Sequence, residues 1–242
     1  MNRENDLREL VERLQQVVGA NLTALVLYGS SAADQEFREE HSDLNVLCLL
    51  QRLDAGELKK LQPVGLWWWR KGHPTPLVFT LPELQESADV FAIELLDMKQ
   101  RHRMLLGDDF LLRFEVPMAL HRSQVERELR TNVIRLRQAF LRSRGRRPEL
   151  SELMIASAST FAALFRHALI ALGEPAPESR RETLDRLAAK LRFDPGAIHA
   201  VLDIRDGKRQ PGEVDIEQTF ASYLDIVSRV AEEMDRRLAA PA

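Results

Sequence analysis

The chain has 242 residues, 45% of them hydrophobic and 29% charged, and its net charge is -3 at pH 7. Such a composition is ordinary for a soluble globular protein, and the length suits one large domain or two small ones. The nearly balanced charge excludes binding to nucleic acid or acidic membranes through whole-chain electrostatics, so any such binding needs a local patch.

Cysteine use and the distribution of apolar residues indicate a cytoplasmic protein. Cys48 is the sole cysteine, so an intrachain disulfide is excluded, which suits a reducing compartment. The N-terminal segment Met1–Asp6 is polar and charged, unlike a signal peptide. No apolar run approaches the length of a membrane span, and we therefore expect no membrane partner.

The first elements follow a helix–strand–helix–strand pattern. Residues 4–19 carry leucines and valines at helical spacing, which predicts an amphipathic helix. The apolar run Leu22–Tyr28 predicts a buried strand. Because serine is a good N-cap, a short helix is expected from Ser30 or from the serine after it. The charged segment Glu36–Ser42 predicts a loop, and Asp43–Leu50 predicts a second strand.

The next segment alternates between helices and a third strand. Residues 54–61 predict a helix that is capped by its first residue, an aspartate. Leu77–Thr80 predicts a short strand, and Pro82 opens another helix. A helical pattern then runs through residues 91–102 and ends near residues 104–109.

Three consecutive tryptophans, Trp67–Trp69, follow the helix predicted over residues 54–61. Three neighbours cannot share one face of a helix or a strand. We therefore expect at least one of them in the core and another at a domain or subunit interface, which leaves a homo-oligomer open. Stacking of these rings on a nucleobase is the less favoured interpretation.

From about residue 119 onward the strand pattern gives way to long helical periods. The sequence therefore predicts two domains, residues 1–118 with the strands and residues 119–242 as a helical bundle. The expected helices cover residues 120–144, 149–172, 179–191, 195–206 and 215–238. The arginine-rich run Arg142–Arg147 is the candidate site if nucleic acid binds, although a solvated helix face is the commoner outcome of such a run.

The strongest functional signal joins the first two strands. Gly29 ends the first strand, and a glycine lets the backbone approach a phosphate closely. Ser30 and Ser31 offer hydroxyls, and the helix expected after them offers free backbone N–H groups. Asp43 and Asn45 are two residues apart in a strand, so their side chains face the same way. Two acids at such positions could share divalent ions beside a triphosphate.

The segments Leu25–Ser30 and Ser42–Val46 resemble the nucleotidyltransferase superfamily related to DNA polymerase beta. Residues 22–110, somewhat under half the chain, are also similar to bacterial minimal and kanamycin-type nucleotidyltransferase domains, with Thr80–Leu84 and Met104–Asp108 as later matching segments. The resemblance implies an α+β fold, with a mixed sheet and flanking helices followed by a helical domain. It also implies a nucleoside triphosphate as substrate or ligand and Mg²⁺ as the cofactor.

The chain departs from the family at its acids. The second acid of the family is Asn45 here, and a neutral amide adds no charge at the metal. The third acid of the family lies on a later strand. In the alignment we prefer, that strand is residues 75–80 and contains no acid; in a second alignment it is Ile93–Leu95, and Glu94 is the third acid. We therefore expect weak Mg²⁺ binding through Asp43 and Asn45.

The resemblance leaves three functions open. The first is a nucleotidyltransferase-fold protein with a degenerate acid set, weakly active or inactive, that binds a nucleotide or regulates. The second is an active magnesium-dependent enzyme that uses Asp43 and Glu94 and transfers a nucleoside monophosphate to a small-molecule, protein or RNA acceptor. The third is an interaction module similar to toxin–antitoxin components. Neither the nucleotide nor the acceptor follows from the sequence.

Overall fold

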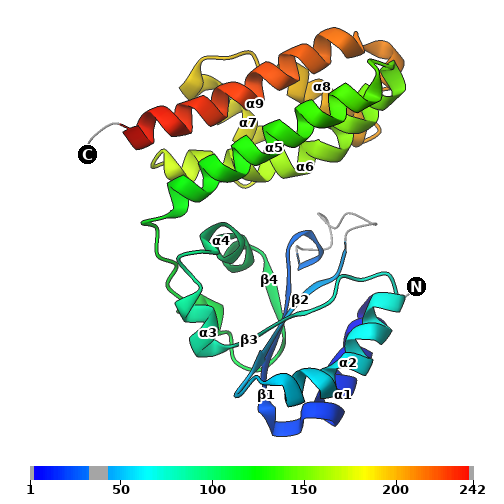
Figure 1. Ribbon diagram of the computed structural model, residues 1–242, viewed down its shortest axis with the longest axis vertical. Helices are drawn as coiled ribbons and strands as arrows, with labels where there is room; N and C mark the ends of the chain where they lie inside the picture. Colours follow the sequence, from blue (N-terminus) through cyan, green and yellow to red (C-terminus); the bar gives the residue numbers. More distant parts are fainter. Residues whose placement is uncertain (1–2, 33–42, 240–242) are drawn as a thin grey trace. The chain divides into compact units, whose positions relative to one another are not determined.

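A computed structural model describes residues 3–32 and 43–239 of the chain. The chain divides into two compact units, Met1–Met118 and Ala119–Ala242. Figure 1 shows that the strands belong to the first unit and that the second unit is helical. The fold is therefore α+β, with a mixed sheet and flanking helices followed by an all-helical unit, as predicted. The predicted loop Glu36–Ser42 lies outside the described residues.

The elements of the first unit run along the chain in an alternating order. They are α1 (Arg3–Val18), a 3₁₀ turn η1 (Gly19–Asn21), β1 (Leu22–Tyr28), a second turn η2 (Ser30–Ala32), β2 (Asn45–Leu50), α2 (Ala55–Arg70), β3 (Leu77–Thr80), α3 (Leu81–Glu86), α4 (Ala92–Gln100), β4 (His102–Leu106) and a further turn η4 (Phe110–Leu112). The three strands predicted from the sequence are present, but the second one begins at Asn45 and not at Asp43, so Asp43 precedes the strand and does not share its alternation of faces.

The strands of the first unit form one mixed sheet in the order β3-β2-β1-β4. The central strand β1 is antiparallel to both of its neighbours, while β2 and β3 are parallel. Because β1 and β2 are antiparallel, the end of β1 lies beside the start of β2, and Tyr28 pairs with Asn45. The residues that the sequence singles out therefore meet at one end of the sheet.

Each face of the sheet is covered by its own helices (Figure 1). On one face, leucines from β1 and β2 pack with the apolar stripe of α1 and with Trp68 of α2. On the other face, Val26, Leu47 and Leu49 pack against Leu84 of α3 and against α4. Successive residues of a strand point to opposite faces, so the nearly continuous apolar runs in β1 and β2 follow from burial on both sides.

Two helix starts in the first unit are capped as their sequences indicate. The Asp54 side chain accepts a hydrogen bond from the backbone N–H of Glu57, which satisfies an N–H that the helix leaves without an internal partner. Thr80 and Glu83 form a reciprocal capping box at the start of α3. The helix predicted over residues 54–61 continues to Arg70, although Pro63 lies inside it.

The longer α2 corrects the sequence prediction and has a physical reason. Leu61, Val64 and Trp68 are spaced as one helical face, and all three are buried in the core with α1. That burial outweighs the hydrogen bond that a proline inside a helix loses. The tryptophan run is therefore helical. Trp68 lies in the core as expected, whereas Trp69 is 62% exposed.

A second correction concerns residues 91–106. The predicted helix over residues 91–102 ends at Gln100, and the strand β4 follows it. The sequence does not reveal β4 for two reasons. The strand is stabilised by its pairing with β1, which is distant in sequence, and its side chains do not alternate between buried and exposed positions. The second alignment is also wrong in its secondary structure, since Ile93–Leu95 lies in helix α4 and not in a strand.

The second unit is built around one apolar helix. Its helices are α5 (His121–Ser143), α6 (Arg147–Ala171), α7 (Arg180–Leu191), α8 (Gly196–Arg205) and α9 (Ile216–Ala239). Helix α6 packs against each of the other four. Among the described residues α6 is also the one helix long and apolar enough to cross a membrane, which is weak evidence because the core helix of a soluble protein has the same composition.

We predict that residues 119–242 fold without the first unit, because α6 buries its apolar side chains against helices of its own unit. A fragment with these residues should give a helical circular dichroism spectrum and unfold cooperatively on heating. The full chain serves as the reference for helical content. A soluble fragment with the spectrum of an unfolded chain would show that the two units are not independent domains.

Candidate functional site

The candidate site lies where β1 ends and β2 begins. Tyr28 pairs with Asn45 in the antiparallel register, and Gly29 follows directly with φ at +82°, a conformation that favours glycine. A Cβ atom added to Gly29 would lie 3.6 Å from the side-chain nitrogen of Asn45. Gly29 and Asn45 are therefore in direct proximity, although 15 residues lie between them in the sequence.

The short helix expected from Ser30 begins there as a 3₁₀ turn, and the residues after Ala32 lie outside the described part of the chain up to residue 42. Over the described residues, Ser30–Ala32 form a single 3₁₀ turn, closed by a hydrogen bond from the N–H of Ala32 to the carbonyl of Gly29. The N–H of Gly29 itself donates to the carbonyl of Arg101 at 3.0 Å, which ties the turn to the start of β4. These hydrogen bonds fix the backbone at Gly29, and the N–H of Gly29 is already used within the protein.

Ser31 joins this turn to the start of the second strand. Its buried hydroxyl donates to the backbone carbonyl of Asp43 and accepts a hydrogen bond from the guanidinium of Arg3 at 2.9 Å. Ser31, predicted as a nucleotide-binding residue, thus holds the backbone that carries Asp43. The Asp43 side chain remains exposed.

Asn45 and Glu94 approach the site from the same side of the sheet. Leu47 and Leu49 belong to the core beneath α3 and α4, and strand alternation puts Asn45 on that face too. Glu94 lies in the first turn of α4 and is exposed. Burial raises the pKa of Tyr28, the last residue of β1, and the negative charge of Glu94 raises it further.

The donor set at this site is smaller than the acid set of the resembling family. The described residues contain no group of three or more histidine, cysteine, aspartate or glutamate side chains that could hold a metal ion. Asp43 offers one carboxylate two residues before the neutral amide of Asn45, and it lies outside β2. Each Mg²⁺ ion is usually held by one or two carboxylates together with substrate phosphates. One carboxylate and one amide therefore do not supply the charge that a site for two metal ions needs.

Two histidines near the site were not expected there. His102, at the end of the helical pattern predicted over residues 91–102, lies in β4, pairs with Tyr28 of β1 and contacts the carboxylate of Asp109 at 3.0 Å. His73 lies behind the site, 3.7 Å from the buried carboxylate of Asp6. Burial lowers the pKa of His73, and the charge of Asp6 opposes that shift. No local sequence signal indicates these positions, because tertiary contacts bring them together.

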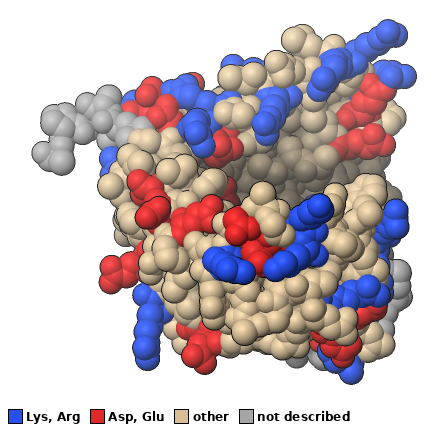
Figure 2. Space-filling view, turned by 60° about the horizontal axis from the view of Figure 1, so that its bottom comes forward, with Lys and Arg blue, Asp and Glu red and all other residues tan. Residues whose placement is uncertain are grey.

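The arginine cluster of the second unit is partly neutralised within the protein. Arg146 pairs with Glu149, and Arg147 approaches Asp215 at 3.8 Å. Figure 2 shows basic and acidic side chains intermixed on the face that it presents. A continuous basic stripe is the pattern typical of nucleic-acid binding, and the described residues on that face do not form one.

Comparisons with known proteins add a distant structural likeness. No protein-family model matches the chain. No curated protein sequence matches it either. Among solved structures, the chain is similar to spectinomycin adenyltransferase AAD(9) from Enterococcus faecialis, whose structure contains ATP and spectinomycin, with 12% identity and a TM-score of 0.47. The similarity covers 92% of this chain and 98% of that one. It is too distant to transfer site residues or substrates.

We predict that Glu94→Gln lowers the pKa of Tyr28, because the substitution removes a negative charge that opposes formation of the tyrosinate. A titration followed by NMR on ¹³C-labelled tyrosine would measure it. The chain has two tyrosines, so Tyr223, whose pKa is raised by burial, serves as an internal reference. An unchanged Tyr28 titration would mean that Glu94 is not at the end of β1.

Proposed function

We propose that this protein binds a nucleoside triphosphate where β1 meets β2, and that it is a nucleotidyltransferase-like protein with an incomplete acid set. The observation that supports this most is the register of the two strands, which brings Gly29 against Asn45. The exposed residue Asp43 precedes β2, and the hydroxyl of Ser31 holds its backbone carbonyl. The same residues carry the sequence resemblance to the superfamily.

The proposed binding mode follows from the chemistry of the three residues. Gly29 has no side chain, so a phosphate can lie directly against its backbone. The amide of Asn45 has its nitrogen towards Gly29, and an amide N–H can donate a hydrogen bond to a phosphate oxygen. An aspartate at the same position would repel that oxygen unless a cation lay between them. Asp43 is left to bind a cation that accompanies the phosphates.

The proposed activity is weak or absent because transfer needs more charge than this site offers. The two-metal mechanism neutralises the triphosphate and activates the attacking hydroxyl through several carboxylates. Among the described residues, Asp43 is the acid that we assign to the cation, so bound nucleotide is the end state in this proposal, and the role is regulatory. A protein can keep its fold after it has lost the activity that the fold supports in other proteins.

An active magnesium-dependent transferase is the second candidate, and one observation favours it. Glu94 acts electrostatically on Tyr28, so its carboxylate approaches the end of the sheet that carries Asp43. In this alternative, Glu94 takes the role of the third acid from a helix, and the acceptor is a small molecule, a protein or RNA. Release of pyrophosphate from a triphosphate in the presence of Mg²⁺ distinguishes it from binding alone.

We predict that Gly29→Val abolishes triphosphate binding. A valine at φ +82° strains the backbone by about 1–2 kcal/mol and adds methyl groups beside Asn45. Gly173→Val is the matched control, since Gly173 has φ +81° in the second unit and a Cβ there would meet nothing within 4 Å.

Calorimetry with ATP, CTP, GTP and UTP, with and without Mg²⁺, measures this prediction. The wild type and Gly173→Val should bind at least one triphosphate, with a dissociation constant on the order of 0.1–1 mM. Gly29→Val should give no binding heat. Equal affinity in the two valine variants would remove Gly29 from the site, and absence of binding to all four nucleotides in the wild type would refute the proposal.

A further inference from the structure

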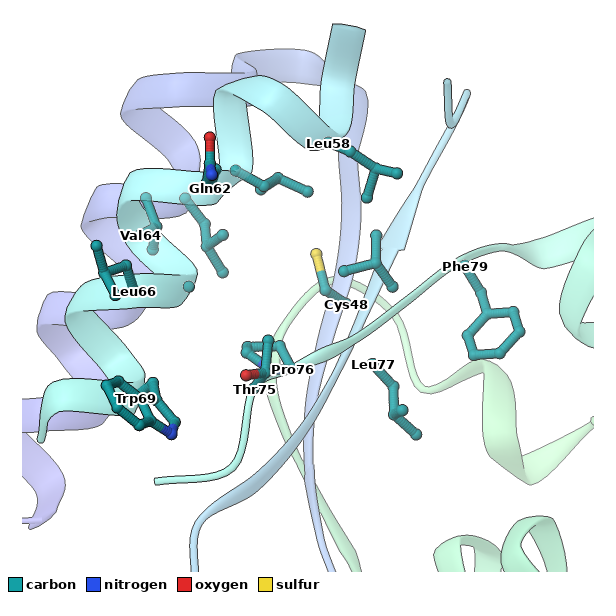
Figure 3. A pocket seen from close by; sticks show the side chains of 14 residues that line it. Cys48, Leu58, Gln62, Val64, Leu66, Trp69, Thr75, Pro76, Leu77 and Phe79 are labelled. Atoms are coloured by element: carbon teal, nitrogen blue, oxygen red, sulfur yellow. The ribbon is translucent and has the colours of Figure 1, made fainter. Parts of the chain in front are cut away.

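A large apolar pocket lies between α2 and the edge strand β3, apart from the site at Gly29. It encloses about 810 Å³ and is lined by side chains from α2, β2 and β3 (Figure 3). In Figure 3 the sulfur of Cys48 points from β2 towards α2, so the inner wall of the pocket lies on the face of the sheet that α1 and α2 cover, and Leu77 and Phe79 line it at the edge strand β3. Asn45 faces the opposite side.

The chemistry of the pocket wall is almost entirely apolar. Among the described residues that line it, none carries a charge at neutral pH, and Gln62 and Thr75 are the polar side chains besides the indole of Trp69. Cys48 is fully buried at the inner wall, and burial raises the pKa of its thiol to about 12. The thiol therefore stays protonated and behaves as a small apolar group.

The rim of the pocket exposes large apolar side chains to water. Trp69 is 62% exposed, Leu58 50%, Leu66 44% and Leu77 41%. Isolated exposed leucines are ordinary on protein surfaces, but here four large side chains surround a single concavity. A ligand that enters the pocket would remove apolar area of both partners from water.

We propose that this pocket binds an uncharged, mainly apolar small molecule. The uncharged wall is complementary to a neutral ligand, because a charged one would lose its hydration without finding a partner. The volume lies within the range of about 300–1,000 Å³ that is typical of small-molecule sites. Gln62 and Thr75 can orient a single polar group of the ligand. The residues that line the pocket do not include Gly29, Asp43 or Asn45, so the test needs no nucleotide.

Gly65 provides a substitution that fills the pocket without harming the fold. It lies inside α2 and lines the pocket, and a Cβ there would meet Thr75 at 3.8 Å, an ordinary contact. Alanine at this position keeps the pocket open, whereas the larger side chain of Gly65→Leu extends into it. Both residues favour a helix more than glycine does, so both variants should fold.

The test is a fluorescence titration of the full-length protein with N-phenyl-1-naphthylamine, a neutral apolar probe, together with light scattering. The wild type and Gly65→Ala should bind one probe molecule per chain with affinities within about twofold of each other, and Gly65→Leu should bind at least about tenfold more weakly. Leu141→Lys, at a 77% exposed position of the second unit, should leave probe affinity unchanged.

Two outcomes would overturn the proposal. In the first, the wild type is a monomer and shows no saturable probe binding, or Gly65→Leu binds as well as Gly65→Ala. In the second, the wild type is a dimer that excludes the probe and Gly65→Leu is a monomer, which would make a second copy of the chain the occupant. Circular dichroism of each variant identifies any that is unfolded.

Discussion

The antiparallel pairing of β1 with β2 is the constraint on which the proposed site depends. It places the last residue of one strand, Tyr28, opposite the first residue of the other, Asn45. The turn at Gly29 and the hydroxyl of Ser31 then fix the backbone on both sides of the pair. A register shift of one residue would turn Asn45 to the other face of the sheet and separate it from Gly29. The apolar side chains of both strands oppose such a shift, since they are buried on both faces.

Burial on two faces also separates the two proposed sites. The face beneath α3 and α4 carries Asn45 and receives Glu94, while the face beneath α1 and α2 contains the apolar pocket beside Cys48. A position in β2 therefore contributes to one site or to the other according to whether its number is odd or even, as Asn45 and Cys48 illustrate. Substitutions at the two sites can be studied separately for this reason.

Local patterns in the sequence predicted the elements that local physics governs. The spacing of apolar residues, the capping residues and the glycine or proline breaks predict several of these elements. They are the strand Leu22–Tyr28, the cap at Asp54, the start of α3 and the helices of the second unit. The strand β4 did not, because its stability comes from pairing with β1, and the helical spacing of Phe91, Leu95 and Met98 masked its start. The motif assigned Gly29 and Asn45 to one candidate site, and the register of β1 and β2 brings them together. The contacts of Ser31 with Asp43 and of Asp6 with His73 depend on tertiary structure. The identity of Asn45 as a degenerate acid stays a prediction.

The most direct measurement of the central claim is the effect of Asn45→Asp on metal-induced stabilisation. An aspartate beside Asp43 rebuilds the acid pair of the resembling family. The two carboxylates repel each other without metal, so we predict a loss of about 1.4 kcal/mol of apo stability for each pKa unit that the pair is raised. Bound Mn²⁺ relieves that repulsion in proportion to its occupancy. Thermal unfolding with and without Mn²⁺ and a triphosphate should therefore show a larger metal-induced rise in Tm for Asn45→Asp than for the wild type or for Asn132→Asp, which adds the same charge in the second unit. An equal rise in all three proteins would contradict the account, because residues 43 and 45 would then not form a degenerate metal site.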